Sequence, residues 1–184
     1  MLARNERAAV GVTKVGAYPE GFDFEVVVIA RDCEDELDPN VIGHRYRPRR
    51  GHIEAEREML RFGVQFADGS KVTNLPGFGR GRPTPGDEPP PGPVMQQRGG
   101  GGGGGEWRQR LWIWPLPPPG PLTFACEWPA AGIKLTLAEV DAQLVIDAAG
   151  RAQQLFERTA DGDGASWSSS SGRLIQRLSS RKED

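Results

Sequence analysis

The chain has 184 residues and a formal net charge of −2. This length excludes a large multidomain enzyme, and no apolar run approaches the ~20 residues of a membrane-spanning helix. The small net charge gives no reason to expect a polyanionic partner. Because the first residues, MLARNERAAV, contain no apolar stretch of signal-peptide length, we expect a cytoplasmic protein in which Cys33 and Cys126 are thiols.

Alternation of apolar and polar residues predicts several strands. Period two, with β-branched and aromatic side chains, occurs over residues 10–12, 22–30, 60–66, 111–116 and 122–128. The dipeptide Asp68-Gly69 directly follows the third run, and residues 71–75 lie beyond it. It predicts a β-hairpin with a type I′ turn, in which both central residues have positive φ.

Two segments have the composition of disordered chain. Residues 76–106 contain 12 Gly and 7 Pro, including seven consecutive glycines at 99–105. Glycine loses the most entropy on ordering and has no side chain to bury, so we expect a disordered loop between two strands. Residues 158–184 are rich in Ser and charge, and they predict a disordered tail.

One helix is predicted, from Leu137 to about Phe156. Thr136 and Glu139 have the spacing of a capping box at its start. An apolar stripe at three- and four-residue steps predicts packing against a sheet; it consists of Leu137, Val140, Leu144, Ala148, Ala152 and Leu155.

These elements predict a mainly β protein: an antiparallel β-sandwich-like, immunoglobulin-like domain over residues 1–157 with one C-terminal helix. The loop at 76–106 interrupts this single domain, and the tail at 158–184 follows it. The Cys–Trp–Cys framework of immunoglobulin domains is missing, because no Trp closely follows Cys33.

Three strings are distinctive: LRFGVQFADG at 60–69, WIWPLPPPGP at 112–121 and FACEWP at 124–129. With the glycine run between them, they resemble a family of small actinobacterial proteins without an assigned activity. The resemblance covers roughly residues 8–156, and it implies no catalytic residues.

Two segments suggest chemistry. His44 and His52 are the only histidines, and they are the candidates for a small hydrolase or metal-dependent enzyme, although four neighbouring arginines oppose a bound cation. Arg80, Gly81, Arg82 and Pro83 resemble the core of an AT-hook, which would bind the minor groove of DNA. Acidic residues follow that segment, so nucleic acid is an unfavoured partner.

The aromatic and proline-rich residues give the leading hypothesis. The alternation of the tryptophans favours core positions, and the prolines between two strands favour a structural corner, but some of these residues could form an exposed surface for a partner protein; these are Trp107, Trp112, Trp114, Pro118 and Pro119. The sequence favours a non-catalytic protein-interaction module, with no catalytic, cofactor-binding or metal-binding residues. No small-molecule ligand and no membrane association are predicted.

Overall fold

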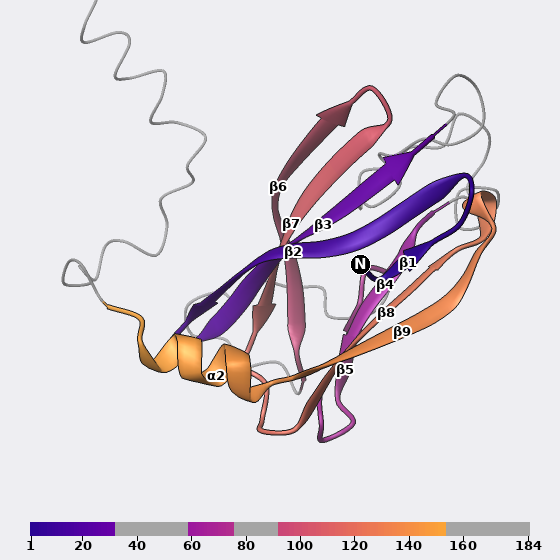
Figure 1. Ribbon diagram of the computed structural model, residues 1–184. Coiled ribbons are helices and arrows are strands. Elements are labelled where there is room, and N and C mark those ends of the chain that lie inside the picture. Colours follow the sequence, from indigo (N-terminus) through magenta and orange to yellow (C-terminus); the bar gives the residue numbers. More distant parts are fainter. Residues whose placement is uncertain (32–58, 76–91, 154–184) are drawn as a thin grey trace, which may run out of the picture. The chain divides into compact units, whose positions relative to one another are not determined.

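Two antiparallel β-sheets dominate the structure, a computed structural model that describes residues 1–31, 59–75 and 92–153 (Figure 1). Sheet A has the strand order β1 (Ala3–Arg4), β2 (Ala8–Tyr18), β3 (Gly21–Ala30), β7 (Glu106–Trp114), β6 (Val94–Gly103). Sheet B has the order β5 (Lys71–Thr73), β4 (Arg61–Gln65), β8 (Pro121–Trp128), β9 (Ile133–Asp141). A 3-10 turn, η2 (Pro129–Ala131), precedes β9, and the helix α2 (Gln143–Gly150) follows it.

The predicted mainly β fold is confirmed: it has two antiparallel sheets and a helix towards the C-terminal end. All of these elements belong to one compact unit, Met1–Ala152. The more specific immunoglobulin-like assignment stays a prediction.

The core lies between the two sheets and follows from the alternation in the sequence. Phe24 of β3 lies 5.7 Å from Phe62 of β4 and 5.2 Å from Phe124 of β8, measured between ring centroids. Trp128, at the end of β8, is fully buried. Aromatic rings at these separations and tilts attract one another in addition to the apolar area that they remove from water.

The predicted Asp68-Gly69 hairpin joins β4 and β5, but its turn is not of type I′. Gly69 has a φ of +85°, whereas Asp68 does not have a positive φ. The Asp68 carboxylate instead accepts hydrogen bonds from the backbone N–H and the hydroxyl of Ser70, at 2.9 and 2.6 Å. The side chain therefore stabilises a turn that needs only one left-handed residue.

The helix predicted from Leu137 to about Phe156 is wrong over its first turns. Ile133–Asp141 is strand β9, which pairs with β8 at Phe124 and Ala138, and the helix runs only over Gln143–Gly150. Leu137 and Val140 fit a helical stripe, but strand pairing with β8 overrides that local preference. The Thr136 hydroxyl donates to the carbonyl of Lys134 rather than capping a helix.

The disordered loop predicted over 76–106 is wrong for residues 94–106. Val94–Gly103 form β6, in which Gly99–Gly103 pair with β7, and Gly104 and Gly105 turn the chain with positive φ. Strands pair through backbone groups, so glycines can pair where no side chain fits. A Cβ on Gly102 would lie 2.7 Å from the Cα of Trp107. Residues 76–91 and the predicted tail at 158–184 lie outside the described residues.

Candidate functional site

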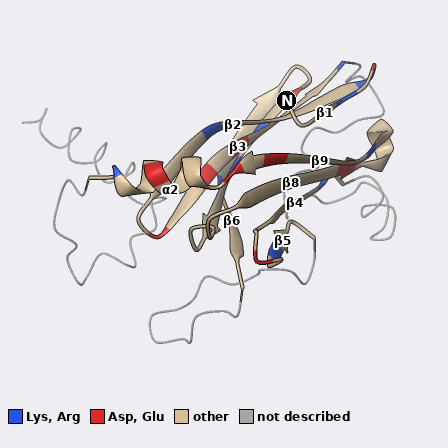
Figure 2. Ribbon diagram, turned by 60° about the horizontal axis from the view of Figure 1, so that its bottom comes forward, with Lys and Arg blue, Asp and Glu red and all other residues tan. Residues whose placement is uncertain are grey.

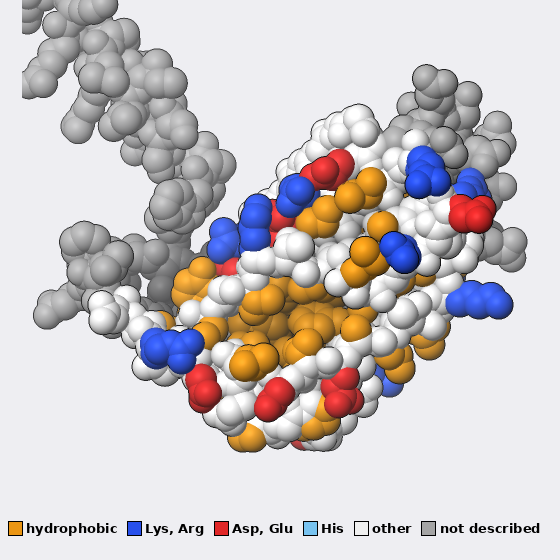
Figure 3. Space-filling model, viewed as in Figure 1, with side chains coloured by type: hydrophobic (Ala, Val, Ile, Leu, Met, Phe, Trp, Pro, Cys, Tyr) orange, Lys and Arg blue, Asp and Glu red, His pale blue; other side chains and the backbone are white. Residues whose placement is uncertain are grey.

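An apolar cleft of about 370 Å³ opens between β2 of sheet A and β9 of sheet B. Figure 3 shows it as a hollowed apolar patch on this face of the molecule. Its lining residues come from the N-terminus, β2, β8, β9 and α2; they are Met1, Leu2, Val12, Val15, Ala17, Leu122, Phe124, Ala138, Val140, Asp141, Leu144, Val145 and Ala148. Of these, Asp141 alone has a charged side chain, so the side chains of the cleft suit an apolar ligand.

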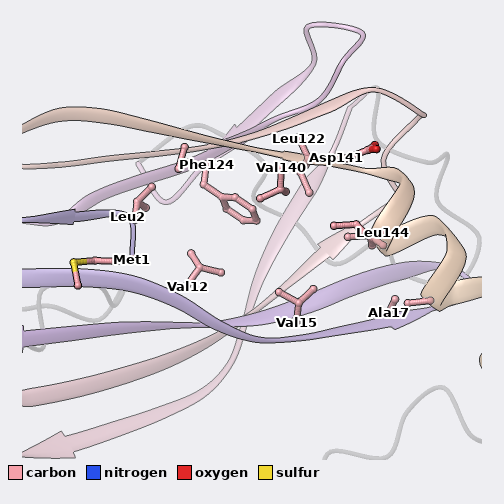
Figure 4. A pocket seen from close by; sticks show the side chains of 13 residues that line it. Met1, Leu2, Val12, Val15, Ala17, Leu122, Phe124, Val140, Asp141 and Leu144 are labelled. Atoms are coloured by element: carbon pink, nitrogen blue, oxygen red, sulfur yellow. The ribbon is translucent and has the colours of Figure 1, made fainter.

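The two sheets supply opposite walls of the cleft. In Figure 4 the side chains of Val12 and Val15 point from β2 towards those of Phe124 and Val140 on the other side. Phe124 and Leu122 form the buried floor, whereas side chains at the opening are in contact with solvent. Val15 is 53%, Val140 40% and Leu144 69% exposed.

A β-bulge in β2 directs its side chains into the cleft. The register between β2 and β3 shifts between Thr13 and Gly16, and Lys14 has a φ of +51°. Positive φ is uncommon for a residue other than glycine, and a bulge adds one residue to one strand of a pair. The inward positions therefore change from the even-numbered Val12 to the odd-numbered Val15 and Ala17.

Both long sides of the cleft are strand edges. β1 pairs with β2 only at Ala9 and Val10, so the rest of β2 has no strand on that side among the described residues. β9 is the last strand of sheet B and pairs with β8 alone within the same part of the chain. An edge strand presents unpaired N–H and C=O groups, which can pair with another chain.

The side of the cleft formed by β9 and α2 is acidic. Glu139, Asp141 and Asp147 are exposed on these two elements, and of the three only Asp141 lines the cleft; Figure 2 shows acidic residues along both elements. Asp141 accepts a hydrogen bond from the backbone N–H of Gln143 (2.9 Å), and Asp147 accepts one from the Gln143 side chain (2.6 Å). Among the described residues, none of the three carboxylates forms a salt bridge.

The outer face of sheet A contrasts with this acidic side, because its charges are paired. Glu25 binds Lys14 and Arg108, and Asp23 binds Arg110 at 2.6 Å. Burial raises the pKa of Glu25, but hydrogen bonds from Arg108 and Lys14 outweigh burial and hold that pKa below its ordinary value. These ion pairs neutralise the charges of Glu25 and Asp23, although Oδ1 of Asp23 accepts no hydrogen bond within the described residues.

The residues of the predicted partner surface come from both faces of β7 and from the proline-rich segment that follows it. Trp107 packs against the core from the inner face of sheet A. Trp112 lies on β7 with its ring 5.4 Å from that of Tyr18. Trp114 and Pro118 line a separate hollow of about 380 Å³, and Pro119 is exposed. As a single surface these five residues stay a prediction, and no ring contact joins the three tryptophans within the described residues.

The other sequence candidates either lie outside the described residues or are buried in the core. His44, His52 and the segment from Arg80 to Pro83 lie outside the described residues. Cys126 is buried, and burial raises the pKa of its thiol to about 11, which suits a packing residue rather than a nucleophile. In the described ranges, no group of three or more His, Cys, Asp or Glu side chains could hold a metal ion.

Sequence reasoning missed the cleft, although one signal for it was present. Val10 and Val12 alternate with small residues, and the alternation then slips by one position to Val15 and Ala17. Such a slip indicates a bulge. Leu144 was assigned to a stripe covered by a sheet, but it is 69% exposed at the open mouth of the cleft.

Comparison of the chain with protein-family models, curated proteins and solved structures gives no match. Within residues 1–31, 59–75 and 92–153, no helix is long and apolar enough to cross a membrane.

Proposed function

We propose that this chain is a non-catalytic protein-interaction module and that the apolar cleft is its binding surface. One observation carries the proposal: apolar side chains at the mouth of the cleft, Val15, Val140 and Leu144, are 40–69% exposed around a hollow of about 370 Å³. Contiguous exposed apolar surface of this kind marks interaction sites. The volume lies within the range of ligand-binding clefts, roughly 300–1,000 Å³.

The cleft is a better candidate than the hollow beside Trp114. That hollow also has the polar residues Asp68 and Ser70 in its lining, whereas the cleft is apolar apart from Asp141. The cytoplasmic location, the immunoglobulin-like assignment and the relationship to the actinobacterial family belong to this proposal as expectations from the sequence. The alternatives, an enzyme using His44 or His52 and a DNA-associated protein using Arg80–Pro83, gain no support from the described residues.

Peptide selection on the immobilised full-length protein tests the proposal. A library of random displayed peptides is selected on the wild type and then compared on Val15→Asp and Ile29→Asp. Both positions are β-branched residues of sheet A and about half exposed, 53% and 49%, but only Val15 lines the cleft. We expect enriched peptides to bind wild type and Ile29→Asp and to lose binding to Val15→Asp.

Failure of the selection to enrich any peptide would contradict the proposal. Enriched peptides that bind Val15→Asp as well as the wild type would also contradict it, because the cleft would then not be the binding surface.

A further inference from the structure

We infer that the partner enters the cleft as an extended peptide strand that adds to the edge of β9 that no other described strand covers, with apolar β-branched residues in the cleft and Lys or Arg towards its N-terminal end. This inference rests on the proposed function and names the chemistry of the partner. It combines three observations: the edge of β9 that has no strand partner in the described part of the chain, the pattern of side chains on the two faces of β9, and the charge beside the cleft.

The unpaired edge favours a peptide over other apolar ligands. β9 (Ile133–Asp141) is long for an edge strand and pairs with β8 alone among the described residues. A small apolar molecule in the cleft would leave the outer N–H and C=O groups of β9 to water. A peptide strand would pair with these backbone groups while its side chains filled the cleft.

The side chains on the two faces of β9 determine which side chains a bound peptide strand would need. On the inner face, Ala138 and Val140 line the cleft, so the partner needs apolar side chains at the matching positions. On the outer face, Leu135 and Leu137 are 66% and 62% exposed, and acidic residues follow at alternate positions towards the end of the strand. An added strand would cover apolar side chains on both faces, which a ligand confined to the cleft would not.

Charge complementarity gives the partner a direction. Glu139 and Asp141 lie at the end of β9, beside Asp147 of α2, and none of the three has a salt bridge within the described residues. Opposite charges on facing positions of paired strands attract each other. Antiparallel pairs are the commoner arrangement, and in that arrangement the basic residues fall in the N-terminal half of the partner.

The same charges disfavour two other occupants. A fatty acid or an anionic lipid would bring negative charge to an acidic border. In an antiparallel pair of two β9 strands centred on Leu137, Glu139 and Asp141 would lie opposite Leu135 and Ile133 of a second copy, so their charges would face no basic partner. A basic, apolar segment of a different protein fits the cleft better.

A synthetic heptapeptide with blocked ends, Lys-Val-Lys-Val-Thr-Val-Thr, is the probe. Paired antiparallel to β9, its two lysines lie opposite Asp141 and Glu139, and its three valines face the cleft side opposite Val140, Ala138 and Thr136. Affinity for the full-length protein is measured by titration followed by amide chemical shifts in NMR. We expect saturable shifts in β9 and in the cleft residues of β2.

Two N-methylated versions of the heptapeptide test backbone pairing. One carries N-methyl groups on the odd-numbered and the other on the even-numbered residues, so the side chains are unchanged. Only one version blocks the N–H groups that face β9. We expect that version to bind at least about tenfold more weakly and the other to bind like the parent, because the lost hydrogen bonds are those of the added strand.

Charge is tested from both sides of the interface. A peptide with Glu in place of both Lys should bind about tenfold more weakly. In the protein, Glu139→Lys should weaken the basic peptide and strengthen the acidic one. Glu6→Lys, which makes the same change of charge at a residue that does not line the cleft, should change neither.

The outcomes separate this inference from the proposed function. If selection yields peptides that depend on Val15, but both N-methylated heptapeptides bind like the parent or the acidic one binds as well as the basic one, strand addition is wrong and the binding surface stands. If sedimentation shows a dimer that Glu139→Lys strengthens, the occupant is a second copy. If selection fails and the heptapeptide shifts no cleft resonance, both proposals fail.

Discussion

The core and the cleft are made of the same kinds of side chain but differ in what covers them. Phe24, Phe62 and Phe124 pack against one another between the sheets. Phe124 also forms part of the floor of the cleft, at whose mouth Val15 and Leu144 are exposed to solvent. Apolar side chains in the core stabilise the fold, whereas those at the mouth of the cleft contribute little until something covers them.

The difference follows from how the sheets are joined. In the core, strands in the middle of both sheets face one another, and each inward side chain meets a partner. At the cleft, the edge strands β2 and β9 face one another across a gap, and the Lys14 bulge turns Val15 and Ala17 into it. The contrast predicts that substitutions in the core change stability and substitutions in the cleft change binding.

Trp128→Ala should have the largest effect on stability. Trp128 is fully buried, and truncating a buried Trp costs about 3–5 kcal/mol. Trp112→Ala should cost less, because Trp112 is only partly buried on the outer face of sheet A. Urea denaturation of both variants measures the difference. If Trp128→Ala lowered the free energy of unfolding no more than Trp112→Ala does, Trp128 would not be a core residue.

Stability should also fall at alkaline pH because of the buried Cys126 thiol. Its pKa is raised to about 11 in the folded chain, so between pH 9 and 11 the unfolded chain releases the thiol proton and the folded chain keeps it. The unfolded state then binds fewer protons, and the free energy of unfolding decreases as the pH rises, by at most about 3 kcal/mol. Below pH 9 this contribution is constant.

Urea denaturation at pH 8 and at pH 10.5 measures this loss, with Cys33→Ser as the background. Cys126→Ala in the same background is the control, because it retains every other titrating group. The wild-type Cys126 protein should lose more stability between the two pH values than the control. Equal losses would mean that the thiol does not titrate differently on folding.

Two neighbouring glycines of β6 differ in the space that is available for a side chain. A Cβ on Gly102 would lie 2.7 Å from the Cα of Trp107, whereas a Cβ on Gly101 meets nothing within 4 Å. Gly102→Ala should cost about 1–3 kcal/mol through overpacking. Gly101→Ala should leave stability unchanged or raise it by up to about 1 kcal/mol. Equal midpoints of thermal unfolding for the two variants would argue against the pairing of β6 with β7.

The smallest expected effects on stability are at the mouth of the cleft. Val15→Asp and Ile29→Asp should each change the free energy of unfolding by only about 0.5 kcal/mol, because both side chains are about half exposed. Their stabilities should therefore match while their peptide binding differs. A selective loss of several kcal/mol in Val15→Asp would place Val15 in the core and remove it from the binding surface.

Side-chain alternation made the central strands predictable. Phe22, Phe24 and Val26 indicate strand β3, and Phe62 and Val64 indicate strand β4. In both strands every second residue is apolar, because the face of each sheet that packs against the other sheet is buried. The Asp68-Gly69 turn was predictable for the same local reason, although its geometry was not. These features depend on residues close together in the sequence.

Features that depend on distant residues were not predictable. The glycines of β6 pair only because β7 accepts their backbone, and Leu137 lies in a strand only because β8 lies beside it. The cleft requires the edges of two sheets to face one another, which the sequence of either strand does not encode. Only the slip in alternation around Lys14 pointed to part of this site.

The most direct test of the account is a map of amide chemical shifts on the full-length protein as the lysine- and valine-containing heptapeptide is added. The account predicts that the largest changes lie in β9 and in the cleft residues Val12, Val15 and Ala17, and that they disappear in Val15→Asp. Changes confined to the outer face of sheet A around Tyr18 and Trp112, or no changes at all, would contradict it.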